Sequence, residues 1–295
     1  MKKQSLATAI TLSLGLSVFG DVTSTFAMTE KSNSITNQPI QMEKGKMHQF
    51  NMTNATQPID FGYDTKKNKD AAKEWGAKHY KKWIDDLLKD DTDDKESKES
   101  KLERKNEREA IKRYTGNDYT KINTHLRNDR KPANKEFDKE IQYIDRALAK
   151  VTTPEAVNVY RRVSEDAFLE KGKKGEKDKR WSKDSLKDKK DKEGKKLDKD
   201  QVKKFKEAFN HTEQSEKAYM STSLVNQTTG NFPKLPILIH LTIPKGKHAA
   251  YLGNLAKLPE SELLIAHGSS YKINSIEQQV DSKEREYLLI EATLN

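Results

Sequence analysis

The chain has no cysteine among its 295 residues, so no disulfide can staple it and its stability must come from its core. Hydrophobic runs are also short. After the N-terminal region, no segment approaches the roughly 20 consecutive apolar residues that a membrane span needs. We find no internal repeat. These absences exclude a disulfide-stapled scaffold and argue against stable membrane insertion.

Two kinds of binding site are missing as well. The basic residues are not interleaved with stacking aromatic residues, so we predict no nucleic-acid partner. The histidines are not clustered at metal-ligand spacings, and we predict no metal. The net charge is +10, but lysine stands in runs mixed with aspartate and glutamate. This pattern predicts a solvated surface, with adhesion to anionic surfaces as the alternative.

Residues 1–27 have the composition of a secretory signal peptide. A charged start, Met1-Lys2-Lys3, is followed by an apolar run from Leu6 to Phe19 and then by small residues ending at Ala27. The run is shorter than a membrane span, which favours a cleaved signal over a transmembrane anchor. We therefore expect a secreted, extracellular protein that is cleaved near Ala27.

The remaining chain divides into an arm and a domain. Residues 28–56 are polar and aperiodic, which predicts a flexible arm. Residues 57–295 have a length that suits one domain. The clearest helix signal is the spacing of Phe137, Ile141, Ile144 and Leu148. Other helices are expected at 68–88, 107–114, 119–126 and 199–209, with a turn at 115–118.

After Pro154 the pattern changes to short strands. The strands are expected at 158–163, 219–224, 237–243, 263–265, 271–276 and 287–293. A lysine-rich stretch, 171–199, interrupts them and is interpreted as a solvated loop or an exposed helix. Helices first and strands later indicate an α+β fold.

Two carboxylates stand just before one of these strands. Glu260 and Glu262 are two positions apart, so in an extended chain both face the same side. Paired carboxylates suit chemistry at an anomeric carbon, where an oxocarbenium-like transition state needs negative charge nearby. The alternative is a solvent-facing turn, and we interpret a second such pair, Glu284 and Glu286, as ordinary.

Two further patterns precede the carboxylates, Tyr160-Arg161-Arg162 and Ser221-Thr222-Ser223. In this order, the three patterns resemble the Arg / Ser-Thr-Ser / Glu-x-Glu signature of bacterial toxin mono-ADP-ribosyltransferases. The resemblance covers about residues 60–295. It is greatest to the enzymatic components of clostridial binary toxins and their Bacillus insecticidal relative, with the Rho-modifying exoenzymes next. It implies N-terminal helices followed by two packed, mainly antiparallel β-sheets that form a cleft for NAD.

The resemblance also implies roles for single residues. Glu262 stabilises the oxocarbenium ion, Glu260 holds the acceptor, and Ser221 orients Glu262. Arg161 offers a two-pronged fork to the NAD pyrophosphate, and Arg162 assists it. The other implied NAD contacts are Tyr114, Tyr119, Asn123 and Phe232, with Phe232 on the nicotinamide ring. Each of these residues also has a purely structural interpretation, as a packed or capping side chain.

The implied function is a toxin-like enzyme that uses NAD as co-substrate and modifies an arginine of a host protein, with actin favoured. The Glu-x-Glu form goes with arginine because a carboxylate matches the guanidinium fork, whereas Rho-modifying relatives carry Gln at the place of Glu260 and target Asn. Three alternatives stay open: modification of a Rho-type GTPase, NAD glycohydrolysis at the same site, and a non-enzymatic partner-docking module.

The chain departs from the binary-toxin pattern at points that bear on its delivery route and on its target. Those enzymes have two such domains in tandem, the first of which docks a separate translocation component that carries the enzyme into the host cytosol. Lys257 also replaces an aromatic residue that in actin-modifying relatives touches the substrate. Further departures are Ser164, Asp166, Ala218 and Leu235. The sequence therefore indicates the activity more firmly than the target.

Overall fold

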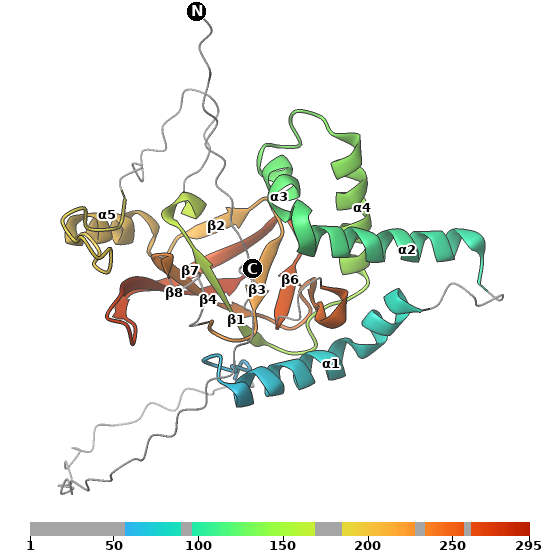
Figure 1. The fold of residues 1–295 in the computed structure, drawn as a ribbon, viewed down its shortest axis with the longest axis horizontal. Helices are drawn as coiled ribbons and strands as arrows, with labels where there is room; N and C mark the ends of the chain where they lie inside the picture. Colours follow the sequence, from blue (N-terminus) through green and yellow to red (C-terminus); the bar gives the residue numbers. More distant parts are fainter. Residues whose placement is uncertain (1–56, 90–95, 169–184, 228–233, 257–260) are drawn as a thin grey trace, which may run out of the picture. The chain divides into compact units, whose positions relative to one another are not determined.

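Figure 1 shows the computed structural model, which describes residues 57–89, 96–168, 185–227, 234–256 and 261–295. The expected signal peptide and arm and residues 171–184 of the lysine-rich stretch lie outside these ranges, and so they remain predictions. Within the described residues, no helix is both long enough and apolar enough to cross a membrane.

The helices begin at side chains that cap their first turn. Thr65, Asn134 and Asp198 each accept a hydrogen bond from a backbone N–H of the helix that follows. The helices are α1 (Lys66–Leu88), α2 (Lys98–Arg113), α3 (Tyr119–Arg127), α4 (Lys135–Ala149) and α5 (Lys199–Phe209). The helices expected at 68–88, 119–126 and 199–209, and the one marked by Phe137 to Leu148, are confirmed.

Two expectations in this region were wrong. Helix α2 starts not at Glu107 but at Lys98, where the Ser97 side chain caps it by accepting a hydrogen bond from the N–H of Ser100. The sequence did not indicate this start, because the first half of the helix is mostly charged. The expected turn at 115–118 is instead a π-helical turn, Tyr114–Asp118, that leads directly into α3. This continuous helical path buries Tyr114.

Eight strands of the described chain form a mixed, mostly antiparallel sheet in the order β2-β7-β8-β4-β1-β3-β6-β5, where β4 and β8 run parallel. Their bounds are β1 (Val157–Val163), β2 (Glu213–Glu216), β3 (Met220–Ser223), β4 (Ile237–Ile243), β5 (Ala249–Tyr251), β6 (Glu262–Ile265), β7 (Ser269–Val280) and β8 (Glu286–Leu294). The α+β class is confirmed. Strands β2 and β5 were missed, because β2 is wholly polar and β5 has three residues.

The two expected sheets are joined. Strand β3 has four residues, and the register linking it to β1 is the pair of Tyr160 with Ser223. Hydrogen bonds therefore connect all eight strands, but the two halves, β2-β7-β8-β4-β1 and β3-β6-β5, meet over a narrow junction. Arg161 is the next residue after that junction.

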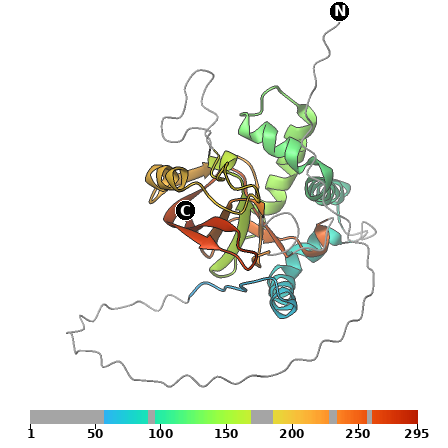
Figure 2. The same ribbon diagram turned by 60° about the vertical axis from the view of Figure 1, so that its left-hand side comes forward.

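Helices α1 to α4 gather on one side of the strands and α5 lies on the other, as both views show (Figures 1 and 2). Close packing fixes α1 against β5: a Cβ on Gly76 would lie 2.4 Å from the ring of Tyr251. Trp83 of α1 donates its indole N–H to the carbonyl of Ala147 on α4 at 2.9 Å. The helical layer is thus tied together where it covers the half-sheet β3-β6-β5.

The segment that precedes α1 is fastened to the start of β1. Ile59 forms a parallel bridge with Val157. The carboxylate of Asp60 accepts a 2.5 Å hydrogen bond from the Tyr160 hydroxyl and lies 3.2 Å from Nε2 of His240. The His240 ring stacks on the Tyr160 ring. These contacts make His240 part of the attachment.

The attachment is expected to depend on pH. Burial would lower the pKa of His240, but the hydrogen bond and charge of Glu291 and the charge of Asp60 raise it above the ordinary value. A raised folded-state pKa adds stability that is complete below the unfolded value of about 6.5 and is lost as pH rises through the folded value. We expect His240→Gln to lower the free energy of unfolding by about 1 kcal/mol near pH 5.5 and by less near pH 8. Urea unfolding at both pH values measures this, and a difference that grows with pH would contradict it.

Candidate active site

Ser221 and Glu262 meet across two neighbouring strands. In the antiparallel pairing of β3 with β6, Ser221 lies opposite Leu264 and Ser223 lies opposite Glu262. Ser221 and Glu262 are therefore diagonal neighbours on one face. The Ser221 hydroxyl donates a 2.5 Å hydrogen bond to Oε1 of Glu262, whose side chain is buried. A short bond to a carboxylate is among the stronger hydrogen bonds, so the Glu262 carboxylate is held in one orientation.

Arg161 reaches the same place from β1. Its Nη1 donates to the backbone carbonyl of Ser221 at 3.3 Å. Tyr271 of β7 lies within reach of the Arg161 charge: burial raises the pKa of Tyr271 to about 12, and the positive charge of Arg161 opposes that rise. The three adjacent strands β1, β3 and β6 thus bring together Arg161, Ser221 and Glu262, the three expected site residues that the structure places in one cluster.

Tyr114 and Asn123 lie beside this cluster. The amide of Asn123 donates a 3.0 Å hydrogen bond to the Tyr114 hydroxyl. Burial raises the pKa of Tyr114, while the charge of Arg161 lowers it and the charge of Glu262 raises it, so its hydroxyl feels both charged groups. The side-chain oxygen of Asn123 is buried and has no hydrogen-bond partner among the described residues. Tyr119 packs against the edge of the hydrophobic core.

Other expected residues are not brought to the cluster. Arg162 is the strand neighbour of Arg161 and therefore points to the opposite face of β1. Its Nη1 donates to the carbonyl of Leu235, and its guanidinium carbon lies 4.2 Å from the ring centroid of Tyr287. The expected assistance of Arg162 at the pyrophosphate stays a prediction. Phe232 and Glu260 lie outside the described residues.

Sequence reasoning missed a second guanidinium near the cluster. Arg127 follows Asn123 by four positions, so the two share a face of α3. Its positive charge acts to lower the pKa of the Tyr114 hydroxyl. Arg127 donates two parallel hydrogen bonds, of 3.0 and 2.9 Å, to the carboxylate of Glu216. The spacing from Asn123 is the signal that would have identified it.

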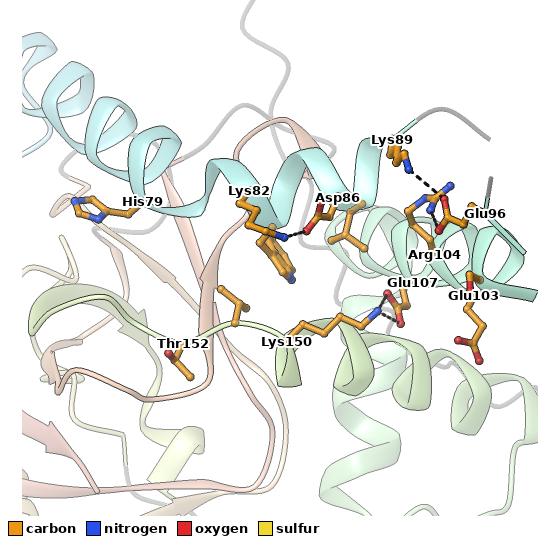
Figure 3. A pocket seen from close by; sticks show the side chains of 14 residues that line it. His79, Lys82, Asp86, Lys89, Glu96, Glu103, Arg104, Glu107, Lys150 and Thr152 are labelled. Carbon is orange, nitrogen blue, oxygen red and sulfur yellow. Dashed lines mark hydrogen bonds and ion pairs between the residues drawn. The ribbon is translucent and has the colours of Figure 1, made fainter. Parts of the chain in front are cut away.

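A large hollow elsewhere in the described chain does not belong to this cluster. It measures about 720 Å³ and lies between α1, α2 and the end of α4, and Arg161, Ser221 and Glu262 do not line it (Figure 3). Several charged side chains that line it pair with one another, as in the Lys150–Glu107 and Lys82–Asp86 pairs drawn there. The residues singled out by the sequence patterns therefore lie at the strand junction and not in this hollow.

Comparison with known proteins agrees with this geometry. The family model of the ADP-ribosyltransferase exoenzymes matches residues 72–295. The chain is 26% identical over 231 residues to the mono-ADP-ribosyltransferase C3 of a Clostridium botulinum D phage, and the match covers 77% of each chain.

Solved structures show the same fold. Plx2a, an ADP-ribosyltransferase toxin from Paenibacillus larvae, is 32% identical with a TM-score of 0.60, covering 80% of this chain and 99% of that one. BECa, the ADP-ribosylating toxin of a C. perfringens binary enterotoxin, was solved with NADH. It is 27% identical with a TM-score of 0.61, covering 81% of this chain but 50% of its own.

The family model spans well over half of the chain and includes the three strands that carry the cluster. Enzymes of this family take NAD as co-substrate and transfer its ADP-ribose. The chain therefore belongs to the ADP-ribosyltransferase exoenzyme family, whose members are toxins of the fold described above.

Proposed function

We propose that this protein is a secreted enzyme that transfers ADP-ribose from NAD to an arginine side chain of a host protein. The observation that carries the proposal is the hydrogen bond from Ser221 to the buried carboxylate of Glu262, beside the guanidinium of Arg161. This arrangement offers a fixed negative charge next to a fixed positive one. The first suits a developing oxocarbenium ion, and the second suits a pyrophosphate.

The reaction breaks the bond between ribose C1′ and the nicotinamide nitrogen. The electron pair of that bond goes to the positively charged nicotinamide ring, which leaves neutral, and the sugar becomes oxocarbenium-like. Glu262, held by Ser221, stabilises this charge through the carboxylate and holds the ribose 2′-hydroxyl. A nitrogen of the acceptor arginine then bonds to C1′ and passes its proton to Glu260.

Several groups of the chain fit NAD. Arg161 presents a planar fork that makes two parallel hydrogen bonds to phosphate oxygens, which a lysine cannot do. The buried oxygen of Asn123 has no partner among the described residues and can accept a hydrogen bond from the dinucleotide. Tyr114 supports Asn123 through its hydroxyl. Phe232 is proposed to pack on the nicotinamide ring and Tyr119 to complete the pocket.

The choice of arginine rests on Glu260. A carboxylate two residues before Glu262 pairs with an incoming guanidinium, whereas the Gln of Rho-modifying relatives suits an uncharged acceptor. Actin is our first candidate for the host protein. It rests on the resemblance of the Arg / Ser-Thr-Ser / Glu-x-Glu pattern to the enzymatic components of binary toxins. A Rho-type GTPase is the second candidate, supported by the likeness to a C3 enzyme.

The test is incubation of purified protein with labelled NAD and, in parallel, host-cell lysate, purified actin and a purified Rho-type GTPase. We expect one labelled band that co-migrates with actin and a modified arginine in its peptide map. A labelled GTPase with a modified asparagine would replace the arginine proposal. Free ADP-ribose without a band would indicate a glycohydrolase, and intact NAD would indicate a docking module.

Secretion and delivery complete the proposal. The predicted signal peptide directs export, and a separate translocation component would carry the enzyme into the host cytosol. N-terminal sequencing of protein from the culture medium tests the first point, because an intact Met1 would contradict cleavage near Ala27.

Arg161→Lys tests the pyrophosphate contact. Lysine keeps the charge but cannot make two parallel hydrogen bonds, so we expect KM for NAD to rise by about tenfold while kcat changes less. Arg162→Lys, on the opposite face of β1, tests the assistance expected of Arg162: a similar rise in KM for NAD would support it, and a KM within about twofold of wild type would make Arg162 a packing residue. Steady-state nicotinamide release measures both. An unchanged KM in the first variant would make Arg161 a structural residue.

A further inference from the structure

We propose that Asp145, on α4, is a positioning residue whose carboxylate fixes the two strands that carry Ser221 and Glu262 relative to each other. The proposal rests on the assignment of Glu262 to NAD cleavage made above. Asp145 belongs to none of the sequence patterns described above.

Each oxygen of the Asp145 carboxylate holds one strand. Oδ1 accepts a 2.6 Å hydrogen bond from the hydroxyl of Tyr219, which precedes Ser221 by two residues. Oδ2 lies 3.0 Å from Nε2 of His267, which follows the last residue of β6, Ile265, by two positions. One side chain of the helical layer therefore bridges both catalytic strands at the end opposite to the Ser223–Glu262 pairing.

The Tyr219 side chain is held in place by burial and by ring packing. It is fully buried, and burial together with the charge of Asp145 raises its pKa well above the ordinary value, so its hydroxyl remains a donor. The ring packs edge-on against Tyr114 at 5.3 Å and against His267 at 5.2 Å. The charges of Arg161 and Glu262 both act on the pKa of the Tyr114 hydroxyl. The packing of Tyr219 on Tyr114 therefore links the bridge to the site.

The backbone pairs β3 with β6 over all four residues of β3, whereas β3 meets β1 at a single position. The strand has four residues and its register with β1 is the pair of Tyr160 with Ser223. A misplacement of about 1 Å in a reacting group can lower a rate by about a hundredfold. The bond between Ser221 and Glu262 spans two strands, so its geometry depends on their relative position. The Asp145 bridge adds a side-chain constraint just beyond the pair of Met220 with Ile265, where the backbone pairing of the two strands ends.

The chain provides a matched control on the same helix. Asp138 also pairs its carboxylate with a histidine, His125, at 3.1 Å, but this pair joins α4 to α3 and touches neither catalytic strand. Asp145→Ala and Asp138→Ala therefore remove the same kind of contact from partly exposed positions of one helix. They differ in whether the contact reaches β3 and β6.

The experiment measures kcat and KM for NAD hydrolysis in the full-length protein, with Tm recorded for every variant. We expect Asp145→Ala to lower kcat about tenfold with KM for NAD within about twofold, because Arg161 stands on β1 and is not held by this bridge. Asp138→Ala should change neither constant by more than about twofold. Tyr219→Phe, which keeps the ring, should lower kcat several-fold, and the double variant Asp145→Ala/Tyr219→Phe should be no slower than Asp145→Ala.

The outcomes separate this proposal from the one it rests on. If the wild-type protein cleaves NAD and Glu262→Gln does not, but Asp145→Ala retains kcat within about twofold of Asp138→Ala, the positioning role is overturned and the assignment of Glu262 stands. Parallel loss of kcat and of NAD binding in Asp145→Ala would also overturn it, as a general structural effect. If the wild-type protein leaves NAD intact, both proposals fall.

Discussion

Glu262→Gln is expected to lower the rate of NAD cleavage by about 10²–10³-fold or more, in both the transfer and the hydrolysis reaction. Glutamine keeps the size of the side chain, and its carbonyl oxygen can still accept the hydrogen bond from Ser221. What it removes is the negative charge that faces the oxocarbenium ion. Initial rates of nicotinamide release, with and without an acceptor protein, measure the effect.

The control for this variant is Glu286→Gln. Glu286 has the same Glu-x-Glu spacing, but it opens β8, which β4 separates from β1, and its carboxylate accepts a 2.7 Å hydrogen bond from the backbone N–H of Leu197. We expect its rates to stay within about twofold of wild type. If Glu262→Gln instead kept wild-type rates within a few-fold, the site would be misplaced, and Glu286 would be the next residue to examine.

The elements that the sequence predicted well are those with an apolar period. The spacing of Phe137, Ile141, Ile144 and Leu148 marks the buried face of α4, where Ile141, Ile144 and Leu148 are fully or almost fully buried. The start of α2 was missed because its charged residues show no such period. Strand β2 was missed because its four residues are polar and it pairs along one edge with β7.

The site shows a similar division. Arg161, Ser221 and Glu262 were predicted from short patterns on strands, and the pairing of β3 with β6 explains why two of them meet. Arg162 follows Arg161 on β1 and faces the opposite side of the sheet, as consecutive strand residues do, and its expected role at the pyrophosphate stays a prediction. The bridge formed by Asp145, Tyr219 and His267 was not foreseeable, because tertiary packing alone joins residues so distant in the chain.

The place expected for the acceptor lies just before β6. Glu260 lies outside the described residues, so its role is argued from its place two residues before Glu262, which opens β6. Ser261, between them, is buried, and its carbonyl accepts a hydrogen bond from the N–H of Leu224. The chain is thus already fastened to the end of β3 one residue before Glu262, which supports a defined place for an acceptor-binding group nearby.

Glu260→Gln should separate transfer from hydrolysis. We expect ADP-ribosylation of arginine acceptors to fall by about a hundredfold, while hydrolysis of NAD in the absence of acceptor stays within several-fold of wild type. Glutamine keeps the size and one acceptor oxygen but loses the charge that pairs with a guanidinium. Water is neutral and small, so its attack on the sugar needs less of that help, whereas Glu262 serves both reactions.

The measurement is the ratio of transfer to hydrolysis in Glu260→Gln and in the wild-type protein. Label transfer to actin and ADP-ribose release are measured on the same preparation. A falling ratio of transfer to hydrolysis supports a carboxylate that acts on the acceptor. Equal loss of both would show that Glu260 supports the sugar chemistry or the shape of the chain before β6. The main reason for expecting an arginine target would then be gone, and an asparagine of a Rho-type GTPase would become the acceptor to test, because an uncharged amide does not need a carboxylate partner.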